Sequence, residues 1–140
     1  MSAYLDASVI IPTLIDEAGS AAVDGFFATE RDLVVSEFAA AEVASALSRL
    51  LRTGKLDRDT AATKLAEFDT WRARDTLDLD IQPADVRLAA IFVRSFDLML
   101  RAPDALHAAA CQRAGMRLIT MDKRLGAAAT KLGVEVQVLL

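Results

Sequence analysis

Histidine and cysteine, which supply nitrogen and sulfur ligands to metal sites, are almost absent from this sequence. The 140 residues include one histidine, His107, and one cysteine, Cys111. A single cysteine excludes an internal disulfide, and a single histidine argues against a zinc site built on histidines. His107 and Cys111 are spaced i, i+4 on an expected helix, where we expect them to pack rather than to bind a metal.

Long apolar runs and an excess of basic residues are also missing. No apolar run reaches the roughly 18 residues that suggest a membrane span, although 54% of the chain is hydrophobic. No basic segment followed by an apolar one opens the sequence, so we expect a cytoplasmic protein without a membrane partner. The net charge of −4 argues against a general nucleic-acid coat, but not against a nucleic-acid enzyme.

Short apolar segments alternate with helical patterns along the chain. The expected strands cover residues 4–6, 33–35, 77–81, 117–120 and 134–138. The expected helices cover about 19–27, 37–52, 57–74, 83–96, 102–114 and 122–131. Pro12 limits residues 9–12 to a turn or a first helical turn. This alternation predicts one α/β domain over residues 1–140, with a parallel sheet covered on both faces.

Two of the expected helices form a hairpin with many large apolar side chains. Ser36 is the expected N-cap of the first helix and Asp57 that of the second. The apolar residues of the hairpin include Leu47, Leu50, Leu51, Leu56, Leu65, Phe68 and Trp71. Part of this surface belongs to the core, and part is available as a groove for a partner helix or a second copy of the chain.

Asp6 and Glu42 do not look like ordinary surface acids. Asp6 ends the first strand, and no basic residue is next to it. Glu42 lies inside a helix, where its neighbours three and four positions away are three apolar residues and a serine, so no local ion pair is available. The alternatives that need no function are a turn cap for Asp6 and a position at the rim of the buried stripe for Glu42.

Asp104 and Asp122 are placed beside the same end of the sheet. Asp104 follows Pro103 in the first turn of a helix, and Asp122 follows the strand over 117–120 as Asp6 follows the first strand. Each has a structural alternative, because an acid in a first turn interacts favourably with the helix dipole and Asp122 is also a good N-cap.

The four acids together suggest a metal site, because the carboxyl ends of parallel strands meet at one edge of a sheet. Converging carboxylates repel and raise one another's pKa unless cations neutralise them. Oxygen-only ligands suit Mg²⁺ or Mn²⁺, and these metals serve in-line phosphoryl displacement.

Four segments of the chain resemble the PIN-domain family. They are Leu5-Asp6-Ala7-Ser8, Ser36-Glu37-Phe38 leading to Glu42, Pro103-Asp104-Ala105-Leu106-His107-Ala108-Ala109, and Ile119-Thr120-Met121-Asp122. Within that family the chain looks most like the VapC-type toxins of type II toxin–antitoxin pairs. Each segment alone is a weak signal, whereas the four in this order in a short chain are specific.

The resemblance implies a fold, an activity and partners. The fold would be a three-layer PIN-like domain with a five-stranded parallel sheet flanked by helices. The activity would be an endoribonuclease that depends on Mg²⁺ or Mn²⁺ and cleaves structured RNA, such as transfer or ribosomal RNA. The partners would be a VapB-type antitoxin that covers the site and a second copy of this chain in a homodimer.

The resemblance also implies roles for single residues. Asp6, Glu42, Asp104 and Asp122 match the four metal-binding catalytic acids of the family, and Ser8 and Thr120 match the small hydroxyl residues that support them.

Two basic positions are candidates for contact with the substrate. Arg101, close to Asp104, either contacts a phosphate or pairs with an acid. Arg49 belongs to a basic group with Arg52, Lys55 and Arg58, which is either a solvated face or a track for an RNA backbone.

Two other functions fit the same acids. One is a phosphatase or phosphotransfer domain with Asp6 as nucleophile, although such sites commonly need a second acid two residues on, where this chain has Ser8. The other is a non-catalytic interaction module in which the acids hold a structural ion.

Overall fold

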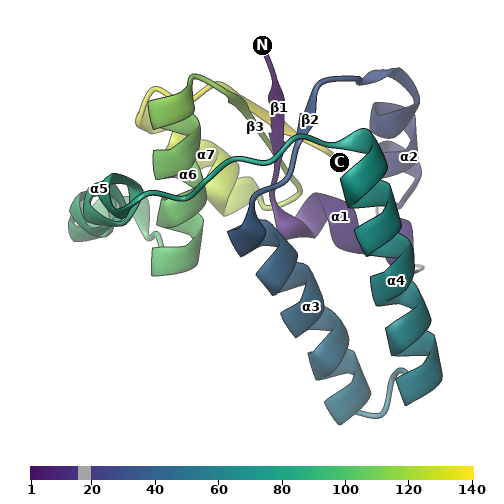
Figure 1. Ribbon diagram of the computed structural model, residues 1–140. Coiled ribbons are helices and arrows are strands. Elements are labelled where there is room, and N and C mark those ends of the chain that lie inside the picture. Colours follow the sequence, from purple (N-terminus) through teal and green to yellow (C-terminus); the bar gives the residue numbers. More distant parts are fainter. Residues whose placement is uncertain (16–19) are drawn as a thin grey trace.

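A parallel sheet of four strands lies at the centre of the structure, a computed structural model that describes residues 1–15 and 20–140 (Figure 1). The strands are β1 (Ala3–Leu5), β2 (Leu33–Val34), β3 (Arg117–Thr120) and β4 (Val136–Val138). Their order is β2-β1-β3-β4, and every neighbouring pair is parallel. The predicted α/β class and parallel sheet are therefore confirmed.

Helices surround this sheet. The described ones are α1 (Ala7–Leu14), α2 (Ser20–Thr29), α3 (Glu37–Arg52), α4 (Arg58–Asp75), α5 (Pro83–Arg94), the 3-10 helix η1 (Phe96–Leu98), α6 (Ala102–Ala114) and α7 (Lys123–Lys131). None of these helices is both long and apolar enough to cross a membrane. The helix start expected at Gly19 lies outside the described residues.

The helices form one layer on each face of the sheet (Figure 1). Along β1, Ala3 and Leu5 belong to the core shared with α1–α4, whereas Tyr4 belongs to the core shared with α5–α7. This division follows from the alternation of side chains along a strand. Small residues let the second layer approach closely: α6 buries a row of alanines, and a Cβ placed on Gly126 of α7 would lie 2.5 Å from Val138 Cγ2.

The fifth strand expected at residues 77–81 does not form. Leu77 makes a single bridge with Val34. Beyond it, the Asp78 carboxylate accepts a hydrogen bond from an arginine of α4 at 3.2 Å, and the Asp80 carbonyl accepts one from an arginine of α6 at 2.9 Å. These bonds lead the chain away from the sheet edge toward α5, so pairing stops after one residue.

Residues 7–14 form a full helix where at most one helical turn was expected. Pro12 lies inside α1. The side chains of Val9 and Ile10 are fully buried in the first core. Their packing outweighs the local tendency of proline to break the helix.

The helix hairpin forms as predicted. Helix α3 spans residues 37–52, and both expected N-caps are present: Ser36 Oγ accepts from Ala39 N–H at 3.0 Å, and Asp57 Oδ1 accepts from Thr60 N–H at 2.7 Å. The hairpin extends beyond the sheet (Figure 1).

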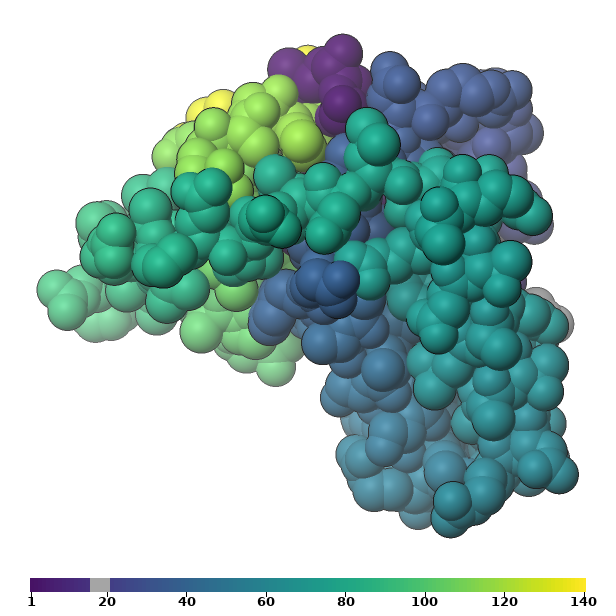
Figure 2. Space-filling model, in the orientation of Figure 1, coloured from purple at the N-terminus to yellow at the C-terminus, as the bar shows by residue number. Residues whose placement is uncertain are grey.

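Most of the apolar surface of the hairpin belongs to the first core. Leu47 and Phe68 are buried. Half-buried residues packed against the same core include Leu50, Leu56, Leu65 and Trp71. In Figure 2, a hollow separates the hairpin from the lobe formed by α5 and α6.

Candidate functional site

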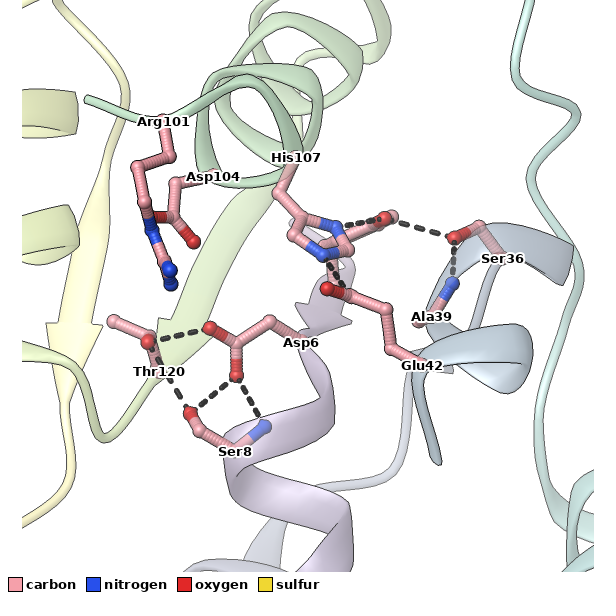
Figure 3. Close-up of polar contacts among 10 residues, drawn as sticks. Asp6, Ser8, Ser36, Ala39, Glu42, Arg101, Asp104, His107 and Thr120 are labelled. Carbon is pink, nitrogen blue, oxygen red and sulfur yellow. Dashed lines mark hydrogen bonds and ion pairs between the residues drawn. The ribbon is translucent and has the colours of Figure 1, made fainter. Parts of the chain in front are cut away.

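Asp6 is the buried centre of the candidate site. It follows β1 directly, is 5% exposed, and is the N-cap of α1. Its Oδ1 accepts from Ser8 N–H at 3.0 Å and from Ser8 Oγ at 2.5 Å, and its Oδ2 accepts from Thr120 Oγ1 at 2.6 Å (Figure 3). The structure thus brings three of the expected site residues together, with both hydroxyls bonded to the carboxylate.

Asp122 is linked to Asp6 through Thr120. Its backbone N–H donates to Thr120 Oγ1 at 3.0 Å. Its side chain is also the N-cap of α7, as the structural alternative predicted, and both capping bonds end on Oδ1, from Arg124 N–H at 2.9 Å and Leu125 N–H at 3.2 Å. The cap therefore uses Oδ1 and does not involve Oδ2.

Asp104 lies in the first turn of α6, and its side chain is 23% exposed. Burial raises the pKa of its carboxyl, and the charge of Asp122 raises it further. Arg101 partly opposes these effects, with its Nε 3.9 Å from Asp104 Oδ2. Arg101 is therefore next to the site, and its own side chain is 83% exposed.

Glu42 approaches the site from α3, and its Oε1 is hydrogen-bonded to Nε2 of His107 (Figure 3). The charge of Glu42 contributes to the raised pKa of Asp6, although burial is the main cause, and the hydrogen bonds from Ser8 and Thr120 oppose it. His107 is buried at 2% exposure. The burial of His107 was expected from the sequence, but its bond to Glu42 was not. Helical spacing relates residues three or four positions apart, whereas Glu42 and His107 are 65 positions apart.

Tyr4 and Ser36 extend this contact into the core. The Tyr4 hydroxyl lies 2.7 Å from His107 Nδ1 and 2.8 Å from Ser36 Oγ. Tyr4 was not among the residues expected at the site. A signal was available, since a tyrosine inside a buried strand needs a polar partner and the chain has only one histidine.

The four acids surround one region but do not form a compact ligand cluster. Over residues 1–15 and 20–140, no three Asp, Glu, His or Cys side chains are grouped as a metal site. Each of Asp6, Glu42 and Asp122 instead accepts a hydrogen bond from a nearby donor, which is expected for carboxylates that repel one another.

The donor set nevertheless fits a hard divalent cation. It consists of carboxylate and hydroxyl oxygens, the ligands of Mg²⁺ and Mn²⁺. Burial raises the pKa of both Asp6 and Asp104, so each carries a charge penalty that a cation would relieve. His107 and Cys111, both buried, are not part of this donor set.

Arg49 lies away from the four acids. It is exposed on α3, seven residues beyond Glu42, or about 10 Å along the helix axis. Of the two arginines singled out from the sequence, only Arg101 contacts an acid of the site.

The parallel sheet and its two helical layers are those of a PIN domain, and residues 3–131 match the PIN-domain family. The chain belongs to this family. Within it the chain is of the VapC type: it is 33% identical over 136 residues to Ribonuclease VapC46 of Mycobacterium tuberculosis, which covers 95% of this chain and 94% of that protein.

Solved structures share the fold at lower sequence identity. VapC20 of Mycobacterium tuberculosis, described as a sarcin–ricin loop cleaving toxin, superposes with a TM-score of 0.74 at 16% identity over 91% of this chain and 95% of that chain. VapBC2 from Rickettsia felis, bound to a DNA fragment from its promoter, gives a TM-score of 0.71 at 11% identity over 100% of both chains. These two similarities concern the fold alone.

Proposed function

We propose that this chain is the toxin of a type II toxin–antitoxin module, a cytoplasmic endoribonuclease that depends on Mg²⁺ or Mn²⁺ and cleaves structured RNA such as a transfer or ribosomal RNA. The observation that carries the proposal is the double role of Thr120, whose Oγ1 donates to Asp6 Oδ2 and accepts from Asp122 N–H. This link between two acids that follow separate strands supports a shared site. The similarity to a VapC ribonuclease over nearly the whole chain supports the same function.

The acids and the hydroxyl residues of the site would have different roles. Asp6, Glu42, Asp104 and Asp122 would hold the divalent cation. That cation would supply charge stabilisation for in-line displacement at phosphorus. Ser8 and Thr120 fix the orientation of the Asp6 carboxylate.

The two arginines would contact the substrate at different points. The exposed guanidinium of Arg101, beside Asp104, would contact a phosphate near the cut. Arg49 would contact the RNA backbone farther along α3.

The phosphotransfer alternative fits this geometry less well. It needs Asp6 as a free nucleophile, but both Asp6 oxygens accept hydrogen bonds and the residue is buried. Ser8 stands where such a site commonly has a second acid. Binding of beryllofluoride to the Asp6 carboxylate, which would mimic a phospho-aspartate, would favour that alternative over the nuclease.

The decisive experiment maps RNA ends after brief expression of the parent and of Asp6→Asn in the same host. We expect new ends at discrete sites in a structured RNA with the parent and none with the variant. The purified parent should cleave that RNA only when Mg²⁺ or Mn²⁺ is added. Equal cleavage by the two proteins would exclude Asp6 from the site, and metal binding without any cleavage would favour the non-catalytic module.

A VapB-type antitoxin is the partner we propose. A groove of about 640 Å³ lies between α2 and α4, with Phe27, Phe68 and Trp71 among its lining residues. Acids also line it, including Asp24, Glu30, Glu67 and Asp75. Three of these acids already form ion pairs within the chain, Glu30, Glu67 and Asp75. A partner segment with apolar side chains would therefore match the aromatic part of this lining. Co-expression with the small reading frame next to the toxin gene should give a stable complex and abolish cleavage.

We also propose that the chain forms a homodimer. An almost wholly apolar pocket of about 550 Å³ lies between α5 and α6, and Val86, which lines it, is 54% exposed. The mass measured by light scattering should be twice that of the 15.1 kDa chain, and Val86→Glu should reduce it to that of one chain.

A further inference from the structure

A continuous chain of hydrogen bonds runs from the start of α3 through β1 and α6 to Glu42 (Figure 3). Ala39 N–H donates to Ser36 Oγ at 3.0 Å. Ser36 Oγ lies 2.8 Å from the Tyr4 hydroxyl, which lies 2.7 Å from His107 Nδ1. His107 Nε2 then contacts Glu42 Oε1. The chain therefore connects the helix cap in the core to one acid of the proposed metal site.

The direction of the bonds follows from the donors available. A backbone N–H can only donate, so the Ser36 oxygen accepts from Ala39 and its own proton is free to go to Tyr4. Tyr4 in turn donates to Nδ1 of His107, and a neutral His107 then carries its proton on Nε2 and donates to Glu42. Every polar proton has one acceptor in this arrangement.

These hydrogen bonds select one tautomer of the imidazole. Nδ1 of His107 accepts from the Tyr4 hydroxyl, so the ring proton lies on Nε2 and is directed at Glu42.

Burial makes this order costly to disturb. Tyr4 and Ser36 are 0% exposed and His107 is 2% exposed, so a group turned away from its partner has no water to replace it. Burial also raises the pKa of Tyr4 far above its ordinary value, which keeps the hydroxyl protonated and able to donate. The rings of Phe38 and Tyr4 pack against the imidazole, with centroids 5.2 and 5.5 Å away.

We propose that Tyr4 and His107 are positioning residues that hold the Glu42 carboxylate in the orientation needed to bind the divalent cation. The inference rests on the proposed function, because it takes Glu42 as a ligand. A glutamate on a helix surface loses rotamer entropy when it binds a metal. The His107 bond at Oε1 removes part of that freedom beforehand and leaves Oε2 for the cation.

The test compares Tyr4→Phe, His107→Gln and His107→Leu with the parent. Tyr4→Phe removes only the hydroxyl, and we expect Mn²⁺ affinity, measured by calorimetry or by electron paramagnetic resonance of free Mn²⁺, to fall about tenfold. His107→Leu should lower it at least as much, whereas His107→Gln keeps an N–H donor and should recover part of the loss. Thr130→Val, which removes a hydroxyl bonded within α7, is the matched control and should bind as the parent does.

A second readout reports the tautomer directly. Because His107 is the only histidine, a long-range ¹H–¹⁵N spectrum of protein without a histidine tag contains one imidazole. We expect the Nε2–H tautomer in the metal-free parent and a mixture of tautomers in Tyr4→Phe. Parent-like spectra and parent-like Mn²⁺ affinity in Tyr4→Phe would overturn the inference.

Glu42→Gln separates this inference from the proposed function. If Glu42→Gln loses Mn²⁺ affinity while Tyr4→Phe and His107→Leu keep it, the positioning role fails and the metal site stands. If Glu42→Gln binds Mn²⁺ like the parent, or the parent binds none, the proposed site itself is wrong.

Discussion

Asp104, in the first turn of α6, has a raised pKa because it is buried, and the charge of Asp122, the N-cap of α7, raises that pKa further. The two acids therefore share one electrostatic environment at the edge of the sheet, and the pKa shift has a consequence for metal binding.

Mn²⁺ affinity should fall as the pH is lowered from neutral toward the raised pKa of Asp104, and binding should release protons. A raised pKa means that Asp104 takes up its proton at a higher pH than the ordinary value of 3.8, and the cation must displace that proton. Calorimetry in two buffers of different ionisation enthalpy measures the release. Asp104→Asn should release fewer protons, and an affinity that does not change over this range would contradict the assignment.

Thr120→Val should weaken both the site and the fold. Asp6 Oδ2 loses a donor and Asp122 N–H loses its acceptor. We expect the free energy of unfolding to fall by about 1–3 kcal/mol and the cleavage rate to fall about tenfold or more. Urea denaturation and cleavage of a labelled RNA measure these effects. Thr120→Ser restores the hydroxyl and should recover most of both, whereas a fully active Thr120→Val would exclude this role.

Asp6→Asn should abolish cleavage without lowering stability at neutral pH. Burial raises the pKa of Asp6 in the folded protein, so the ionised carboxylate costs free energy once the pH exceeds that pKa. The contribution of the Asp6 carboxyl to the stability of the parent is fully present below pH 3.8, its pKa in the unfolded chain. That contribution is lost as the pH rises through the higher pKa of Asp6 in the folded protein. The unfolding temperature of Asp6→Asn should therefore equal or exceed that of the parent at pH 7, and this advantage should shrink in acid.

Gly126→Ala should destabilise the fold, because the new Cβ would lie 2.5 Å from Val138 Cγ2 on β4. Overpacking of this kind costs about 1–3 kcal/mol. Gly25→Ala is the matched control on α2, where nothing lies within 4 Å of an added Cβ, and it should stabilise the helix by about 1 kcal/mol. Thermal unfolding measures both. Adding Val138→Ala to Gly126→Ala should recover part of the loss, and equal effects of the two glycine substitutions would contradict the close contact.

Local signals predicted the elements well where the deciding contacts are close in sequence. The bounds of α3 and the caps at Ser36 and Asp57 depend on residues within a few positions of one another. The contact between Asp6 and Ser8 is of the same kind. The family resemblance put Thr120 beside the acids, and its hydroxyl is hydrogen-bonded to Asp6 in the structure.

The two errors have a different origin. Residues 77–81 have the alternation of a strand, but bonds from arginines of α4 and α6 hold Asp78 and Asp80 and end the pairing after Leu77. Pro12 was expected to limit α1, but burial of neighbouring apolar residues outweighs its local effect. In both cases, distant partners outweigh a correct local preference.

The sequence by itself determined the α/β class and most of the helices and strands, because these depend on periodicity, and its short motifs predict the four acids of the site. Only the tertiary structure decided that Thr120 joins Asp6 to Asp122, and that Tyr4 and His107 lead to Glu42. Tyr4 and His107 are 103 positions apart, and His107 and Glu42 are 65 apart. No local pattern encodes such pairs, because a buried polar group takes whichever partner the packed core brings within hydrogen-bonding distance.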